Sequence, residues 1–190
     1  ISGLVQLGEY DSVRDLVDTL TRRRAEINDA VTRRISDPAV AALLIAKTSL
    51  AAESGVALEL ASESHLCALA PAVATDVITL LGNLIDNAVE VSVGSESALV
   101  AVRIDDRNGL TIAVADSGPG VPEHLREEIF ARGVTSKPDV PGGRGIGLAL
   151  VRLVTAQYGG SVSVTDGDNG GALFAVRLPE IVTAQQAAHA

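Results

Sequence analysis

The chain of 190 residues is 47% hydrophobic, only 2% aromatic, and carries a net charge of −9. This composition predicts one domain with a helical appendage and an aliphatic core, and it argues against wholesale disorder. The negative charge disfavours binding to nucleic acid, and the single cysteine, Cys67, excludes an internal disulfide and favours a reducing compartment.

The first third of the chain is predicted to be helical. Apolar residues recur at three- and four-residue steps, as in a seam that packs against a partner helix: Val13, Leu16, Leu20, Ile27 and Val31. Asp11 or Ser12 is expected to cap this helix. A second helix is predicted to start with Asp37 as its cap and Pro38 in its first turn, and to run to about Glu53.

The same third gives two expectations about the whole protein. Its longest apolar run, Ala39 to Ala46, is far shorter than the roughly 20 residues of a membrane-spanning helix, and no basic segment marks a signal peptide. The chain opens at Ile1 with an apolar, helix-like fragment and has no methionine, so we expect a piece of a longer protein.

Strands and helices are expected to mix from Val56 onward. Alternating or β-rich patterns predict strands at 56–60, 99–104, 110–115, 161–165 and 172–178. Helical periods cover 70–91 and 146–158, a short helix is expected near 123–130, and Asn108-Gly109 suits a tight hairpin turn. This order predicts an α+β fold, with helices over a mixed, mainly antiparallel sheet.

The first motif that can carry chemistry is the pair Asn83 and Asn87, one turn apart on one helix face. Amide oxygens suit Mg²⁺, which keeps several waters and shares phosphate oxygens. Two solvated positions on an amphipathic helix would give the same pattern, so this motif leaves both interpretations open.

The second motif, Asp116-Ser117-Gly118-Pro119-Gly120, directly follows a predicted strand. A carboxylate at a strand end can accept a hydrogen bond from the exocyclic amine of adenine, and the glycines let the backbone come close to the base. All five residues are also turn formers, so this motif by itself more often marks a plain turn.

The third motif, running from Gly142 to Leu148, opens the helix predicted over 146–158. Glycines before a helix expose backbone N–H groups and a favourable dipole to phosphate, and Arg144 adds positive charge. The motif is neither a Walker A loop nor a dinucleotide fingerprint, because no Gly-Lys-Ser/Thr follows it and no parallel β unit surrounds it.

In this order, the three motifs resemble the Bergerat (GHKL) superfamily, which includes the ATP sites of gyrase, Hsp90, MutL and the histidine kinases. The resemblance covers roughly Val56 to Leu178 and implies a two-layer α/β sandwich that binds ATP and Mg²⁺. It implies that Asn87, with Asn83 nearby, handles Mg²⁺ and phosphates, and that Asp116 reads adenine. The other nucleotide-binding residues implied are Gly118, Gly120, Gly143, Arg144, Gly145, Gly147 and Leu148.

Residues 119–143 would form the ATP lid of this superfamily, with Phe130 at its conserved aromatic position and 171–174 as the closing strand. Within the lid, Thr135, Ser136 and Lys137 could meet the β- and γ-phosphates, which makes Lys137 a candidate catalytic residue beside Asn87. An exposed loop lysine is the plainer interpretation of the same residues.

The branch of the superfamily is indicated by position 83. Hydrolysing members carry a glutamate there as general base, whereas this chain has Asn83, and Asp86 and Glu90 are out of register. A missing base favours phosphoryl transfer over hydrolysis. The amino-terminal helices agree, because histidine kinases carry a helical hairpin that dimerises into a four-helix bundle.

Four segments are similar to the citrate/C4-dicarboxylate sensor kinases (CitA/DcuS type): 1–8, 35–44, 82–88 and 133–137. In that group the phosphoacceptor histidine would lie just before Ile1, so the hairpin would be truncated. The histidines present, His65, His124 and His189, are expected to be ordinary surface residues, and no Cys/His cluster has zinc-ligand spacing.

The resemblance implies a kinase core that passes the γ-phosphoryl of ATP to a histidine and thence to a response-regulator aspartate. Its expected partners are a response-regulator receiver domain and a second copy of the chain, and no nucleic acid is expected to bind. The kinase core is expected to lie in the cytoplasm and to be attached to a membrane only through upstream segments of the sensor. The expected division is a dimerisation region at 1–55, an ATP-binding domain at 56–179 and a flexible tail at 180–190. The alternatives are a hydrolase of the Hsp90 or MutL kind, an anti-sigma-factor-like serine kinase, and a degenerate regulatory domain.

Overall fold

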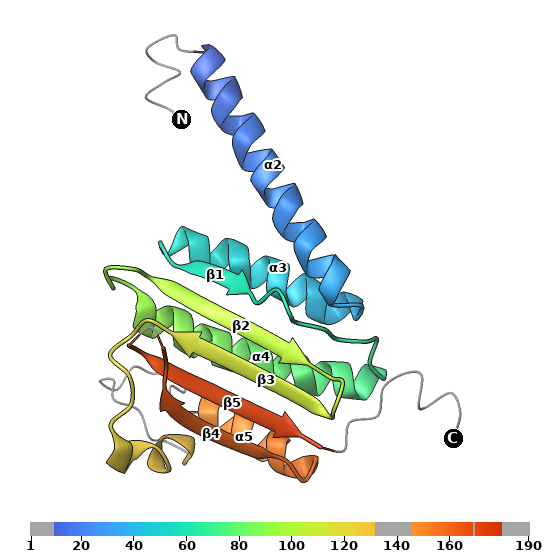
Figure 1. Ribbon diagram of the computed structural model, residues 1–190, viewed down its shortest axis with the longest axis vertical. Coiled ribbons are helices and arrows are strands. Elements are labelled where there is room, and N and C mark those ends of the chain that lie inside the picture. The colour runs from blue at the N-terminus through green and yellow to red at the C-terminus, as the bar shows by residue number, and fades with distance from the viewer. Residues whose placement is uncertain (1–9, 132–145, 169, 180–190) are drawn as a thin grey trace.

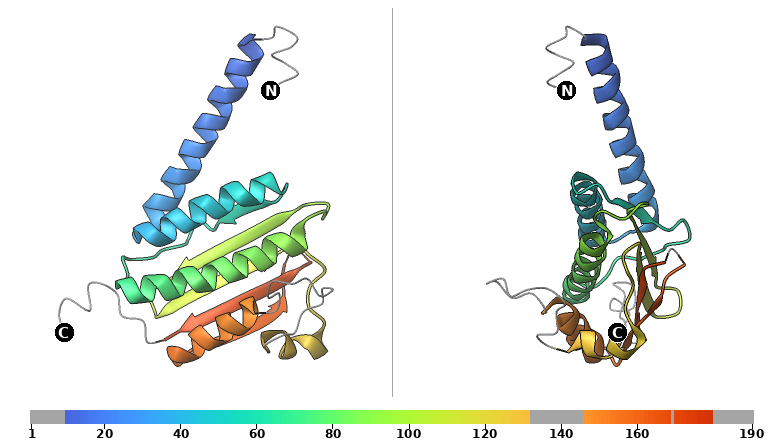
Figure 2. Two further views of the ribbon diagram at one scale, coloured as in Figure 1. Left: turned by 180° about the vertical axis from the view of Figure 1, so that it is seen from behind. Right: turned by 90° about the vertical axis from the view of Figure 1, so that its left-hand side faces the viewer.

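A five-stranded sheet and a layer of helices on one of its faces make up most of the molecule, and one long helix projects from them (Figures 1 and 2). This is a computed structural model, and it describes residues 10–131, 146–168 and 170–179. The predicted two-layer α+β sandwich is confirmed.

The sheet has the strand order β1-β2-β3-β5-β4. Its strands are β1 (Ala57–Leu60), β2 (Leu99–Asp105), β3 (Leu110–Asp116), β4 (Ser161–Asp166) and β5 (Ala172–Leu178). Strand β1 pairs with β2 in parallel and every other pair is antiparallel, so the predicted mixed, mainly antiparallel sheet is also confirmed. The turn between β2 and β3 places Gly109 at a φ of 77°, a conformation that glycine adopts without a steric penalty.

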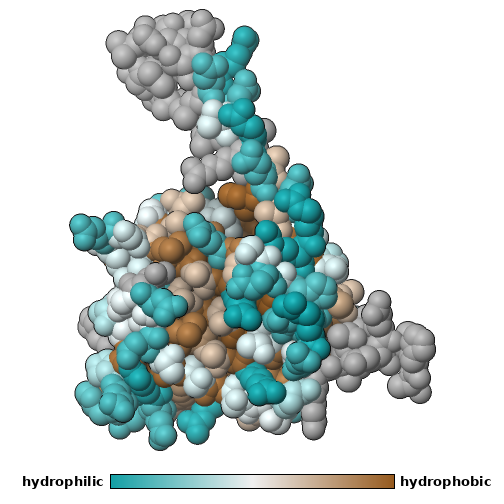
Figure 3. Space-filling view, viewed as in Figure 1, coloured by the Kyte–Doolittle hydropathy of each residue, from teal (hydrophilic) through white to brown (hydrophobic). Residues whose placement is uncertain are grey.

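The two faces of the sheet differ because alternate residues of a strand point to opposite sides. Val100, Val102 and Ile104 of β2 face the helices and are fully buried. The other face carries polar residues such as Arg103 and Thr111 together with apolar ones such as Leu99 and Leu173. Figure 3 accordingly shows apolar patches bordered by polar residues over it.

The helical layer consists of α3 (Pro38–Glu53), α4 (Pro71–Ser92) and α5 (Gly147–Gln157), which lie side by side in Figure 2. Helix α3 begins as predicted, with the Asp37 carboxylate accepting hydrogen bonds from the N–H groups of Ala39 and Val40. Among the helices described, only α4 is long and apolar enough to cross a membrane by length and composition. Its apolar face is instead buried in the domain core, where Leu80 and Leu84 have no exposed surface.

The projecting helix, α2 (Tyr10–Arg34), starts earlier than predicted. Asp11 and Ser12 therefore lie within its first turn and do not occupy the cap position, so this detail of the prediction is wrong. At its other end, Val31 is buried in the same core as the sheet. The expected seam residues Val13, Leu16 and Leu20 lie on α2, but their side chains are outside the described part of the structure.

Two short 3₁₀ helices, η1 (Glu123–Leu125) and η2 (Glu128–Phe130), replace the single short helix predicted near 123–130. Phe130 is buried, and its ring meets that of Phe174 on β5 edge to face, with centroids 6.2 Å apart. This aromatic contact fixes the described part of the expected lid segment to the sheet.

Candidate functional site

Asp116, the last residue of β3, is a buried carboxylate with 2% of its surface exposed. Its Oδ1 accepts hydrogen bonds from the N–H groups of Gly118, at 2.9 Å, and Ala172, at 3.1 Å. Its Oδ2 accepts none from the residues that the structure describes. Two backbone donors therefore hold the carboxylate in one orientation and leave its second oxygen for an outside donor such as an amine.

Glycines allow the backbone to approach this carboxylate closely. A Cβ at Gly171 would lie 2.1 Å from the carbonyl oxygen of Asp116 and 2.3 Å from its Oδ1. A Cβ at Gly118 would lie 2.8 Å from Val91 of α4, and Gly120 has a φ of 76°. The glycines at positions 118 and 171 are therefore required by contact, and the one at 120 by conformation.

Asn83 and Asn87 lie on α4, as predicted, and their side chains differ in surroundings. The Asn83 Nδ2 donates to the carbonyl oxygen of Thr79 at 2.7 Å, and its Oδ1 lies 2.7 Å from where a Cβ at Gly147 would be. Asn83 thus packs against the start of α5. Asn87 is half-buried, and its amide makes no hydrogen bond to any residue that the structure describes, so it is available to a ligand.

The acidic residue between the two asparagines is held on another side of α4. Asp86 forms an ion pair with Lys47 of α3, with 2.5 Å between its Oδ1 and the Lys47 Nζ. Its side chain points toward α3, whereas Asn83 points toward α5. Asp86 is therefore in the wrong place to act as a base between α4 and α5.

Helix α5 begins at Gly147, and no side chain caps its first turn. Its first N–H groups lack intrahelical partners and suit a phosphate oxygen. Leu148, the next residue, is half-buried against the core. Six other predicted site residues lie outside the described residues: Thr135, Ser136, Lys137, Gly143, Arg144 and Gly145.

Residues of α4, of the loop after β3 and of the start of α5 lie close together, although they are distant in the sequence. We call the following five residues the candidate site: Asn83, Asn87, Asp116, Gly118 and Gly147. The contact of Gly118 with Val91 joins the loop after β3 to α4, and the contact of Gly147 with Asn83 joins α4 to α5. The part played by the Ala172 N–H was not predicted from sequence. Only the resemblance of 171–174 to a closing strand pointed to this segment.

His65 and His124 lie at the surface, as expected, and His65 also takes part in a polar cluster. His65 is half-exposed, but its Nδ1 lies 2.7 Å from Oδ1 of Asp106, and the N–H of Cys67 donates to Oδ2 of the same carboxylate at 2.7 Å. His65, Cys67 and Asp106 therefore form a polar cluster, although no zinc-ligand spacing is visible along the chain. His124 lies on η1, and His189 is outside the described residues.

Comparison with known sequences gives three informative relatives. A family model described as histidine kinase-, DNA gyrase B-, and HSP90-like ATPase matches residues 72–181. The sensor histidine kinase DpiB of Escherichia coli K12 is 35% identical over 185 residues, which cover 95% of this chain and 34% of that protein. The sensor protein CitS of Bacillus subtilis 168 is 36% identical, with coverages of 95% and 33%. The sensor histidine kinase DcuS of Escherichia coli K12 is 34% identical, with coverages of 94% and 33%, so the chain spans about a third of these relatives.

Solved structures with similar folds agree with these sequence relatives. Full-length ShkA in complex with AMPPNP is 30% identical and superposes with a TM-score of 0.60 over 75% of this chain and 30% of that one. The ATP binding domain of PrrB from Mycobacterium tuberculosis is 29% identical, with a TM-score of 0.54 and coverages of 74% and 93%.

Proposed function

Since the chain belongs to the histidine kinase-, DNA gyrase B-, and HSP90-like ATPase family, and carries an ATP-binding catalytic domain of the histidine kinase type, we propose that it is the kinase core of a two-component sensor. In the whole protein this core would transfer the γ-phosphoryl group of ATP to a histidine. A response-regulator aspartate would then receive it.

The observation that carries this proposal is the chemistry around position 83. Asn83 stands where a hydrolase needs a carboxylate, and its amide is engaged by Thr79 and packs against Gly147. The adjacent Asp86 is held by Lys47 on the α3 side. Without a carboxylate to deprotonate water at this point, the site favours transfer to a protein group over hydrolysis.

The described residues suggest how the nucleotide would be held. Asp116 Oδ2 would accept a hydrogen bond from the adenine amine, because its other oxygen is already engaged. The first N–H groups of α5, at Gly147 and Leu148, would face phosphate oxygens. Catalysis would come from positioning and charge neutralisation.

The donor set also fits a bound Mg²⁺. The Asn87 amide is half-buried and unengaged by the described residues, and one amide oxygen suits a cation that keeps waters and phosphate oxygens as its other ligands. When bound, Mg²⁺ would offset the negative charge of the phosphates. Thr135, Ser136, Lys137 and the 143–145 segment stay proposed phosphate contacts, with Lys137 as a proposed catalytic residue.

The proposed partners follow from the same role. They are a response-regulator receiver domain and a second copy of the chain, paired through α2 and the helix expected before it. We place the kinase core in the cytoplasm, attached to a membrane through other parts of the protein, with no nucleic acid partner.

The division of the chain is also a proposal. Helix α3 lies beside α4, and its Val40 and Leu44 belong to the same core as the sheet. This packing favours an ATP-binding domain that begins near residue 36, earlier than the boundary at 55 suggested by the sequence, with a tail from residue 180.

The test titrates the chain with Mg·ATP by calorimetry and follows phosphate release in the same sample. We expect binding, negligible release, and a loss of affinity of about 10-fold or more for Asp116→Asn, which replaces an acceptor oxygen by a donor. The control Asp168→Asn changes an exposed carboxylate and should bind as the wild type does. Sustained phosphate release would indicate a hydrolase. Absence of binding would contradict the ATP site, and acid-labile phosphate on the chain would show that one of its own histidines is an acceptor.

A further inference from the structure

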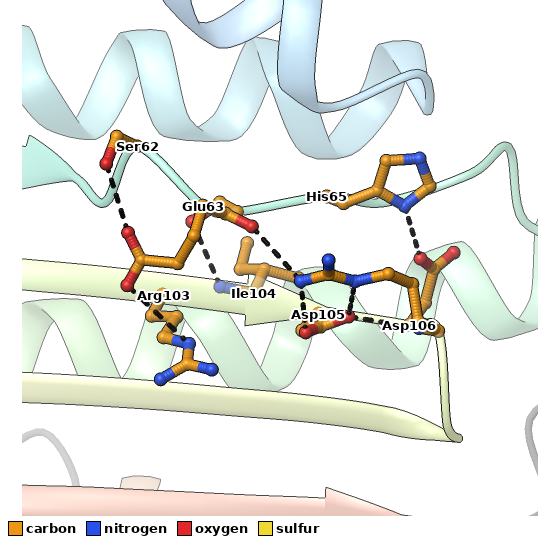
Figure 4. Close-up of polar contacts among 9 residues, drawn as sticks. Ser62, Glu63, His65, Arg103, Ile104, Asp105 and Asp106 are labelled. Carbon is orange, nitrogen blue, oxygen red and sulfur yellow. Dashed lines mark hydrogen bonds and ion pairs between the residues drawn. The ribbon is translucent and has the colours of Figure 1, made fainter.

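A second cluster of reactive side chains, His65, Cys67 and Asp106, lies away from the candidate site, where the segment before α4 meets the turn after β2. Figure 4 shows two of its members, His65 and Asp106. His65 forms a single β-bridge with Asp105, and this bridge brings the 61–69 segment alongside the end of β2. The next residue, Asp106, then receives the His65 Nδ1 and the Cys67 N–H on its two oxygens, each at 2.7 Å.

The three side chains hold their potential ligand atoms close together. One imidazole nitrogen of His65, the Cys67 Sγ and one Asp106 oxygen all lie within 4.8 Å of one another. Ligands around a tetrahedral zinc ion lie about 2.0–2.3 Å from the metal, and hence roughly 3.5 Å from each other. Shifts of about 1 Å would therefore be enough to arrange the three groups around an ion: the most distant atoms move closer, and the His65 Nδ1, now 2.7 Å from Asp106 Oδ1, moves away from that oxygen.

Two of the three ligand residues differ in burial: Asp106 is held in place, whereas His65 can move. The side chain of Asp106 is 3% exposed, and its position is fixed by the Cys67 N–H, whereas the His65 side chain is 49% exposed. The imidazole can therefore rotate toward an ion without disturbing the core, and its exposed side leaves a path for the ion to enter.

We propose that His65, Cys67 and Asp106 form a binding site for Zn²⁺, with water as the fourth ligand. An imidazole nitrogen, a thiolate and one carboxylate oxygen make a ligand set that zinc accepts in tetrahedral geometry. Magnesium and calcium are disfavoured because they select oxygen ligands. The Cys67 thiol gives up its proton to solvent as the ion binds. The His65 imidazole binds as the neutral ring and keeps its N–H on the nitrogen that does not face the ion.

The surroundings give this site a structural consequence. Leu66, between two of the ligands, bridges Ile35 just after α2, and the Leu66 carbonyl accepts from Ser36 N–H at 2.7 Å. The Arg34 guanidinium, from the last residue of α2, donates to the Ser62 carbonyl at 3.0 Å. A bound ion would therefore stiffen the segment through which α2 joins the ATP-binding domain.

This site is separate from the nucleotide. In the β2–β3 pair, Asp105 lies opposite Thr111 and Val100 lies opposite Asp116, so the Asp106 cluster and the candidate site lie at opposite ends of the same strands. Ion binding can therefore be assayed without ATP, and its failure would leave the proposed kinase function untouched.

The experiment titrates the reduced, metal-free chain with Co²⁺ and then displaces it with Zn²⁺. We expect one ion per chain and a cobalt–thiolate charge-transfer absorption, which must come from Cys67 because the chain has one cysteine. Zn²⁺ should also raise the melting temperature, because a ligand that binds the folded state stabilises it.

Variants decide which side chains bind the ion. Cys67→Ser should abolish the charge-transfer band, and His65→Gln should weaken Zn²⁺ binding by about 10-fold or more. The control His124→Gln alters a surface histidine on η1 and should leave both unchanged. A folded wild type that gives no thiolate band, or Zn²⁺ binding that survives Cys67→Ser unchanged, would reduce the cluster to a His65–Asp106 ion pair and overturn the proposal.

Discussion

Replacing Gly171 by alanine tests how the candidate site is assembled. The added Cβ would lie 2.1 Å from the Asp116 carbonyl oxygen and 2.3 Å from its Oδ1. Real Cβ atoms do not approach this closely, so the backbone must move. The obstacle includes backbone of β3, which pairs directly with β5 along six residue pairs from Leu110↔Leu178 to Ala115↔Leu173, so a local side-chain rotation cannot relieve it.

The expected magnitude follows from this contact. Overpacking a well-packed interior costs about 1–3 kcal/mol, and Gly171→Ala should lower the free energy of unfolding by that amount. The shift would also separate the Ala172 N–H from Asp116 Oδ1, which are 3.1 Å apart. Losing a charge-assisted hydrogen bond of about 1.5–3 kcal/mol and the orientation it maintains should weaken ATP binding by about 10-fold or more.

The assay combines urea unfolding with calorimetric titration of Mg·ATP. Gly82→Ala is the matched control, because a Cβ there meets nothing within 4 Å and the residue lies inside α4. It should stabilise the chain by about 0.5–1 kcal/mol through helix propensity and leave ATP affinity unchanged. If Gly171→Ala unfolds at the wild-type urea concentration and binds ATP equally well, then β5 does not hold Asp116 in place, and the reasoning is refuted.

Three further perturbations probe other contacts, each by urea unfolding. Asp37→Ala removes a buried acceptor for three backbone N–H groups, including the cap of α3, and should cost about 2–3 kcal/mol; a loss below about 0.5 kcal/mol would contradict this. Tyr158→Phe removes a 2.7 Å hydrogen bond to Asp76 and should cost about 1 kcal/mol, whereas unchanged stability would show that the bond adds nothing. The side-chain hydrogen bond from Arg107 lowers the pKa of Asp105 from 3.8 to about 2, so its stabilisation is present above pH 3.8 and is lost as the pH falls toward 2. Asp105→Asn should make stability less dependent on pH within that window, and an unchanged pH profile would exclude this contribution.

Local sequence patterns determined most of the secondary structure. The alternation in Leu99–Asp105 and the helical period in Pro71–Ser92 follow from which side of one element must be buried, and the Asp37 cap acts on residues two and three positions away. Where local signals compete, the predictions were less accurate. Asp11 and Ser12 lie inside α2, one and two residues after its first residue, Tyr10, because local signals locate a helix end only to within one or two residues.

The three glycine- and asparagine-bearing motifs indicated an ATP site through the resemblance of their order to the Bergerat superfamily, and each of them is visible in the sequence because its residues lie within a few positions. Only the tertiary structure decided what meets each motif. The Asp116 carboxylate accepts a hydrogen bond from the N–H of Ala172, which lies 56 residues away in the sequence. His65 forms a hydrogen bond with Asp106, which lies 41 residues away. Such contacts depend on strand pairing and register, where a slip of one residue turns every side chain to the opposite face. Neighbouring residues along the chain therefore encode the elements and the motifs, whereas the register of the sheet determines which side chains come together.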